Sequence, residues 1–108
     1  MTTTAATDWL PEIVNRLVRE FDPLKIILFG SHARGEANMH SDLDLLVVLQ
    51  RVSPKRREAV EMRCALGDLP VSKDVIVTTP EEIDRRGDLV GTVLRPALRE
   101  GRVLYERG

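Results

Sequence analysis

Apolar residues recur along the chain at two spacings, and these spacings predict where helices and strands alternate. A first stripe has helical spacing, with Asp8 as a candidate cap and Pro23 as its end. Its members are Leu10, Ile13, Val14, Leu17 and Phe21. A Ser-Pro start and a second stripe predict another helix over residues 53–67. That stripe consists of Ala59, Met62, Leu66 and Leu69.

Shorter helices are predicted at three further places. One lies near residues 31–37, and another opens at Pro80. A third apolar stripe covers residues 89–98 and contains Pro96. Because proline breaks or kinks a helix, this stripe is predicted to form two short pieces.

Short runs rich in β-branched residues predict the strands. Three of them cover residues 25–30, 42–49 and 71–79, and a fourth segment, residues 101–108, is expected to close the chain as an edge strand. Helices and strands therefore alternate along the chain, which predicts a single α/β (α+β) sandwich.

The first two strands are joined by a short connection, residues 31–41. A parallel crossover needs about a dozen residues or more, so this length favours an antiparallel pair. That pairing would place the end of the first strand beside the start of the second. Gly30 and Ser31 would then face Asp42 and Asp44.

Chain length, charge and composition limit the classes of protein to which the chain can belong. A chain of 108 residues is expected to form one domain over residues 1–108. Its 16 basic and 17 acidic residues nearly cancel, so no strong nucleic-acid signal is present. A single cysteine, no long apolar run and no signal-peptide pattern lead us to expect a soluble, cytoplasmic protein without a membrane segment.

Two acids lead into the otherwise apolar second strand. Side chains alternate along a strand, so Asp42 and Asp44 are expected on one face while the leucines between and after them pack on the other. Such acids repel each other unless a divalent cation such as Mg²⁺ neutralises them. If Asp74 on the third strand points to the same face, three acids could hold two ions, and Asp74 is a candidate general base. The alternatives are a solvated strand start for the pair and an ion pair with Lys73 or an arginine for Asp74.

The turn after the first strand supplies a complementary anion site. Gly30 allows a close backbone approach, and Ser31 offers a hydroxyl and the N–H groups of a helix start. Arg34, one turn along, could add a charged contact to a triphosphate, or it could equally pair with an acid of the site or lie in solvent.

Together, "GSHARG" at residues 30–35, "SDLDLLV" at residues 41–47 and the isolated Asp74 resemble the minimal nucleotidyltransferases of the DNA polymerase beta superfamily. The resemblance implies a nucleotidyltransferase fold with a small mixed sheet of three to four strands packed with helices. It implies transfer of a nucleoside monophosphate, with ATP the expected substrate, to an acceptor hydroxyl. Asp42 and Asp44 correspond to the metal-binding pair of this family and Asp74 to its third carboxylate. Gly30 and Ser31 correspond to its phosphate-binding turn.

Short members of this family resemble the antitoxins of pairs whose partner is a helical HEPN-type ribonuclease toxin. The resemblance implies that such a protein adenylylates its toxin. Two alternatives stay open: a binding module that blocks its partner without catalysis, and an enzyme for a small molecule such as an antibiotic, completed by a partner subunit. The nucleobase preference, the acceptor and the oligomeric state do not follow from the sequence.

Overall fold

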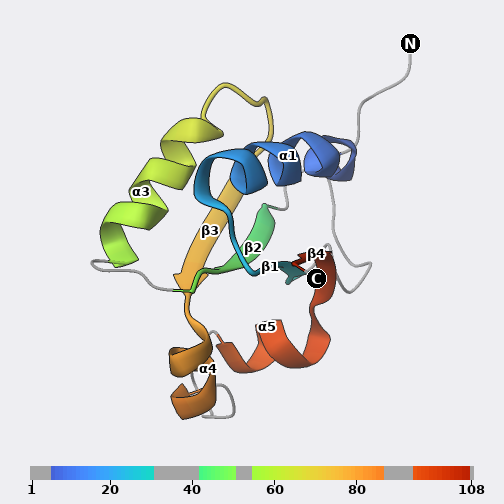
Figure 1. Ribbon diagram of the computed structural model, residues 1–108. Coiled ribbons are helices and arrows are strands. Elements are labelled where there is room, and N and C mark those ends of the chain that lie inside the picture. Colours follow the sequence, from blue (N-terminus) through green and yellow to red (C-terminus); the bar gives the residue numbers. More distant parts are fainter. Residues whose placement is uncertain (1–5, 31–41, 51–54, 87–93, 108) are drawn as a thin grey trace.

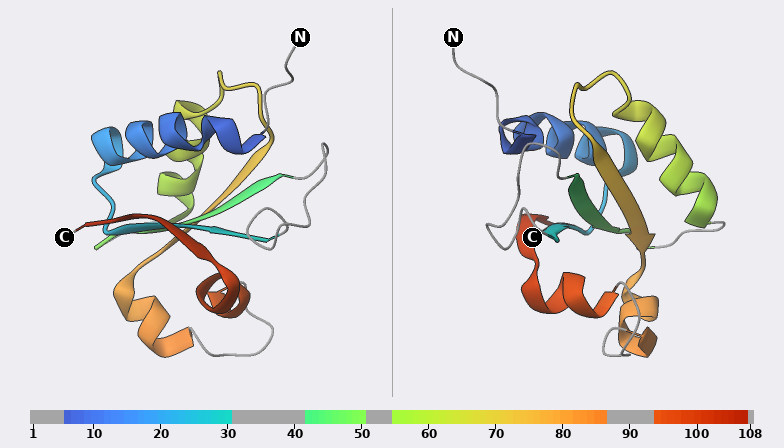
Figure 2. Two further views of the ribbon diagram at one scale, coloured as in Figure 1. Left: turned by 90° about the vertical axis from the view of Figure 1, so that its right-hand side faces the viewer. Right: turned by 180° about the vertical axis from the view of Figure 1, so that it is seen from behind.

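Helices cover both faces of a four-stranded sheet in the computed structural model, which describes residues 6–30, 42–50, 55–86 and 94–107 (Figure 1). Its elements are η1 (Ala6–Trp9), α1 (Leu10–Phe21), β1 (Lys25–Phe29), β2 (Leu43–Val48), α3 (Lys55–Ala65), β3 (Lys73–Thr78), α4 (Pro80–Arg86), α5 (Leu94–Glu100) and β4 (Arg102–Glu106). Figure 2 shows three layers, with α1 and α3 on one side of the sheet and α4 and α5 on the other.

The sheet has the order β3-β2-β1-β4 and is mixed. Strand β1 pairs antiparallel with β2 and with β4, whereas β2 and β3 run parallel. The predicted antiparallel pairing of the first two strands is confirmed, as is the closing edge strand. At one end of the sheet the end of β1 therefore lies beside the start of β2 (Figure 2).

The larger core lies between the sheet and the helices α1 and α3. From the helices come Ile13, Leu17 and Met62, from the turn after α3 comes Leu66, and from the strands come Ile26, Leu28, Leu43, Leu45, Val47, Val75 and Val77. Strand residues that alternate with these point to the opposite face, where Ile27 and Leu46 pack with Ala97 of α5. Both faces of the central strands are thus covered over most of their length, as their continuous apolar runs predict.

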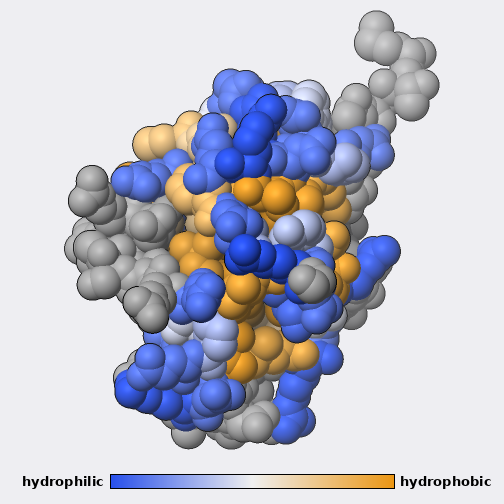
Figure 3. Space-filling view, in the orientation of Figure 1, coloured by the Kyte–Doolittle hydropathy of each residue, from blue (hydrophilic) through white to orange (hydrophobic). Residues whose placement is uncertain are grey.

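Figure 1 shows this sandwich with α1 and α3 above the strands and α4 and α5 below them. Figure 3 shows apolar side chains gathered in the middle of that view, between the hydrophilic surface of α1 at the top and that of α4 at the lower left. Within the described ranges, no helix has both the length and the apolar character that spanning a bilayer requires.

Two predicted helix boundaries were wrong. Asp8 does not cap α1, because the chain enters that helix through the 3₁₀ turn η1, and Trp9 stands at the cap position without a side-chain hydrogen bond. Pro96 does not divide the last helix, because α5 begins at Leu94 and so places Pro96 in its first turn, where no backbone N–H is needed. The predicted helix at residues 31–37, the cap at residues 53–54 and the start of the stripe at residues 89–93 lie outside the described residues.

Arg16 joins α1 to the segment that follows α3. Its guanidinium donates to both carboxylate oxygens of Asp68, to the carbonyl of Ala65 and to Glu12 one turn earlier. The hydrogen bond from Arg16 lowers the pKa of Asp68 below its ordinary value, and the same pair raises the pKa of Arg16. A connection between distant parts of the chain therefore depends on the ionised form of Asp68.

This ion pair predicts a pH-dependent contribution to stability. A carboxyl group whose pKa is lowered by folding stabilises the native state above its unfolded pKa, about 3.9 for aspartate, and loses that contribution as the pH falls through the lowered value. We therefore expect Asp68→Asn to lower the free energy of unfolding at pH 7 and to differ less from the unchanged protein below pH 4. Urea unfolding followed by circular dichroism at several pH values measures this. Glu81→Gln, which removes an ion pair within one helix, is the control and should have a smaller effect at pH 7. A difference for Asp68→Asn that is the same at pH 7 and pH 2 would contradict the assignment.

Candidate functional site

Three of the predicted site residues form a row across the end of the sheet. Gly30 directly follows β1, whose last residue, Phe29, pairs with Asp44 on β2. Asp44 in turn pairs with Asp74 on the parallel neighbour β3. Paired residues on adjacent strands point to the same face, so the carboxylates of Asp44 and Asp74 lie on one face, which is the condition the sequence analysis set for a three-acid site.

The face that carries this row is the one that α5 covers farther along the strands. Ile27 and Leu46 pair with each other on this face and pack against α5. Two residues toward the end of the sheet, the same positions are held by Phe29 and Asp44. The acids therefore lie where the apolar face ends, while Leu43 and Leu45 are fully buried on the other face.

Gly30 passes directly against Asp44. Its φ angle is +76°, in the left-handed region that side chains disfavour. A Cβ atom built on Gly30 would collide with Oδ2 of Asp44. Residues with a side chain are therefore disfavoured here twice, once by backbone strain and once by the carboxylate.

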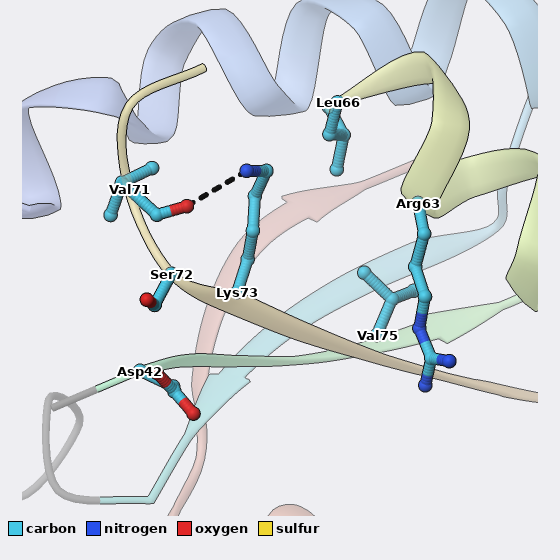
Figure 4. A pocket seen from close by; sticks show the side chains of 7 residues that line it. All are labelled: Asp42, Arg63, Leu66, Val71, Ser72, Lys73 and Val75. Atoms are coloured by element: carbon cyan, nitrogen blue, oxygen red, sulfur yellow. Dashed lines mark hydrogen bonds between the residues drawn. The ribbon is translucent and has the colours of Figure 1, made fainter. Parts of the chain in front are cut away.

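Asp42 precedes β2 and is exposed. In Figure 4 its carboxylate points away from the side of the sheet toward which Lys73 points. Lys73 pairs with Leu43, which is buried against α1 and α3, so Asp42 extends toward the face of Asp44 and Asp74. The expectation that the two acids of the pair share a face is met.

Asp74 forms an ion pair that the sequence named only as an alternative. Nη2 of Arg63, in the last turn of α3, lies 3.1 Å from Oδ1 of Asp74. The two side chains are 56% and 50% exposed. Lys73, the other partner considered, instead donates to the carbonyls of Leu69 and Val71, and burial lowers the pKa of its ammonium group.

A hollow of about 350 Å³ lies between the C-terminal part of α3 and the start of β3 (Figure 4). Its lining combines apolar and charged residues: Asp42, Arg63, Leu66, Val71, Ser72, Lys73 and Val75. Two lining residues also reach the acid row: Asp42 extends toward it, and Arg63 is bonded to Asp74.

Arg63 is the residue at the site that the sequence did not single out. It stands in a basic stretch whose charges suggest a solvated helix surface, and only the packing of α3 on β3 brings it to Asp74. Ser31 and Arg34, both predicted to bind the nucleotide, lie outside the described residues.

The row has the donors that a hard divalent cation takes. Carboxylate oxygens of Asp44 and Asp74, with Asp42 beside them, suit Mg²⁺, and the backbone of Gly30 lies against the carboxylate of Asp44. Within the described parts of the chain, no three His, Cys, Asp or Glu side chains come together as a metal-binding group. In this arrangement Asp74 accepts a hydrogen bond from Arg63 through Oδ1.

The sequence of the chain is similar to those of known proteins. A family model described as a nucleotidyltransferase domain matches residues 10–104. A proposed protein adenylyltransferase of Methanocaldococcus jannaschii is 48% identical over 50 residues, which make up 44% of this chain and 33% of that relative. The matched segment thus spans about a third of the curated relative.

Solved structures show the same fold. A proposed nucleotidyltransferase from Sulfolobus solfataricus superposes with a TM-score of 0.62 at 22% identity, over 98% of this chain and 91% of that one. A mutant of the MntA-HpeT toxin-antitoxin gives a TM-score of 0.53 at 21% identity, over 91% and 73% of the two chains. A toxin-antitoxin with AMP-PNP gives 0.52 at 22% identity, over 89% and 73%. At these identities the likeness concerns the fold, which is the nucleotidyltransferase fold that the sequence predicted.

The contact between Gly30 and Asp44 predicts an unusual cost for a small substitution. We expect Gly30→Ala to lower the free energy of unfolding by about 1 to 3 kcal/mol, because alanine strains the left-handed backbone and meets the carboxylate. Denaturant unfolding measures this. Gly67→Ala is a matched control, because its Cβ would lie 3.5 Å from the nearest atoms, the carbonyl oxygens of Arg63 and Cys64. That control should change stability by less than about 1 kcal/mol.

A double-mutant cycle separates the two causes. Asp44→Ala in the Gly30→Ala background removes the collision but not the backbone strain, so the two substitutions should be non-additive and the second should recover part of the loss. Strict additivity would show that Gly30 and Asp44 are not in contact.

Proposed function

Because the chain belongs to the nucleotidyltransferase domain family, we propose that it transfers AMP from ATP to a hydroxyl group of a partner protein. The observation that carries the proposal is the row of Gly30, Asp44 and Asp74: a left-handed glycine lies against Asp44, and Asp44 is paired with Asp74 on the adjacent strand. The end of a sheet that serves only stability has no need of a left-handed glycine facing a carboxylate. A nucleotide site needs the glycine for the phosphates and the carboxylate for the metal ion, since phosphates and metal ions bind side by side.

Each residue has a separate role in this proposal. Asp42 and Asp44 hold magnesium, and Asp74 completes the site from β3. Gly30, with Ser31 and Arg34, binds the phosphates of ATP. Magnesium, when bound, neutralises the phosphates and stabilises the attacking and leaving oxygens. Three acids provide enough oxygen ligands for two such ions.

The reaction is a displacement at the α-phosphorus of ATP. The acceptor oxygen forms a bond to that phosphorus, the bond to the β-phosphate oxygen breaks, and pyrophosphate leaves. Asp74 accepts the proton of the acceptor hydroxyl, because it lies at the outer strand of the row, on the side away from the glycine turn. The phosphates and the acceptor thus approach the acids from opposite sides.

The partner we propose is a helical toxin of the HEPN type, which AMP transfer would inactivate. The toxin-antitoxin structures that share this fold support a protein acceptor. So does the relative from Methanocaldococcus jannaschii, which is described as a protein adenylyltransferase. We propose a cytoplasmic location for the pair.

The proposal predicts that AMP is attached to the partner. Incubation of both proteins with Mg²⁺ and ATP should transfer label from the α-phosphorus of ATP to the partner and none from the γ-phosphorus. Intact-mass measurement of the partner should show whole AMP units. Asp74→Asn should slow transfer by about 10²- to 10⁴-fold as the loss of a general base, and Asp44→Asn should slow it at least as much.

Asp84→Asn is a matched control, because this exposed aspartate lies on α4, away from the row. It should transfer AMP at the unchanged rate. If the chain binds the partner tightly, adds no label, and the combined variant Asp42→Asn with Asp44→Asn still neutralises the toxin, the protein acts by binding and the enzymatic proposal fails.

A further inference from the structure

We propose that Arg63 is the cation that Asp74 holds while no metal ion is bound, and that a metal ion shared by the acids must displace it. The inference rests on the proposed function, which assigns Asp74 to the metal site. It adds a residue from α3 to that site and gives the residue an effect opposite to that of a ligand: Arg63 weakens metal binding.

The geometry starts with the position of Arg63 at the end of α3. That helix packs against β3, the outer strand of the sheet. Figure 4 shows the Arg63 side chain extending from the helix past Val75 to the level of the strand. Its Nη2 reaches Oδ1 of Asp74 at 3.1 Å, within the range of a charged hydrogen bond.

The pair is strong enough to orient Asp74 and weak enough to be broken. Both side chains are about half exposed, and the bond joins one nitrogen to one oxygen. Exposed pairs of this kind contribute little to stability because water and salt screen them. A divalent ion that gains the same carboxylate can therefore replace the guanidinium.

The charges around Asp74 indicate whether Arg63 is displaced by a metal ion or helps to hold it. Asp44 and Asp74 are direct neighbours across β2 and β3, and their negative charges repel each other when no cation is present. Arg63 relieves that repulsion in the metal-free protein. Once a metal ion lies between the acids, a guanidinium bonded to one of them adds positive charge beside a cation, so both cannot share Asp74 favourably.

Manganese binding to the nucleotide-free protein tests this directly. Mn²⁺ replaces Mg²⁺ at oxygen sites, and its affinity can be measured by calorimetry or by the electron paramagnetic resonance signal of the free ion. We expect Arg63→Gln to bind Mn²⁺ about two- to fivefold more tightly than the unchanged protein in 0.15 M salt, which corresponds to the loss of an exposed ion pair.

Lys73→Gln is the matched control for charge. Lys73 is adjacent to Asp74 in sequence, but its ammonium group bonds to loop carbonyls on the other side of the sheet. Its removal deletes the same charge without breaking the pair, and we expect a change below twofold because salt screens the remaining effect. Thermal unfolding of both variants checks that they fold.

The outcomes separate this inference from the proposed function. If Asp44→Asn abolishes Mn²⁺ binding but Arg63→Gln binds no more tightly than Lys73→Gln, Arg63 does not compete and the inference is overturned. Weaker binding by Arg63→Gln would overturn it as well, because Arg63 would then support the site. If neither the unchanged protein nor Arg63→Gln binds Mn²⁺, the metal site and the proposed function are both wrong.

Discussion

The site depends on the close approach of Gly30 to the carboxylate of Asp44. This contact exists because β1 and β2 run antiparallel in a register that pairs Phe29 with Asp44, so the residue after β1 must pass beside the acid. Only glycine can pass there without collision and at a positive φ angle. A second pairing, the parallel one of β2 with β3, aligns Asp44 with Asp74. Two strand pairings thus place the turn and the acids.

One face of the sheet carries most of the apolar core, and the other face carries the acids. On one face, α1 and α3 bury the leucines that alternate with the acids, which fixes the direction in which Asp44 points. On the other face, α5 packs against Ile27 and Leu46 in the middle of the strands, and Asp44 lies two residues from Leu46 toward the end of the sheet. Charged groups can therefore stay hydrated next to a rigid core, as an electrostatic site requires. In the proposed reaction, the acids would keep their positions while nucleotide and acceptor exchange.

Much of this arrangement could be predicted from the sequence because it follows from local patterns. The length of the connection at residues 31–41 predicted the antiparallel pair, and side-chain alternation predicted that Asp42 and Asp44 share a face. The errors at Asp8 and Pro96 concern helix starts, where a preceding turn or a shift of the first residue changes the role of one side chain. Arg63 could not be foreseen, because its contact with Asp74 depends on how α3 packs on β3, and no local pattern encodes that packing.

In the proposed function, Gly30, Asp44 and Asp74 form one site for a metal-bound nucleotide. Crystals grown with Mn²⁺ and a non-hydrolysable ATP analogue test it most directly, because manganese gives an anomalous signal that locates the ion independently of the protein. We expect this signal between the carboxylates of Asp44 and Asp74, with the phosphates of the analogue against the backbone at Gly30. Bound nucleotide elsewhere on the protein, with no manganese signal at the two aspartates, would contradict it.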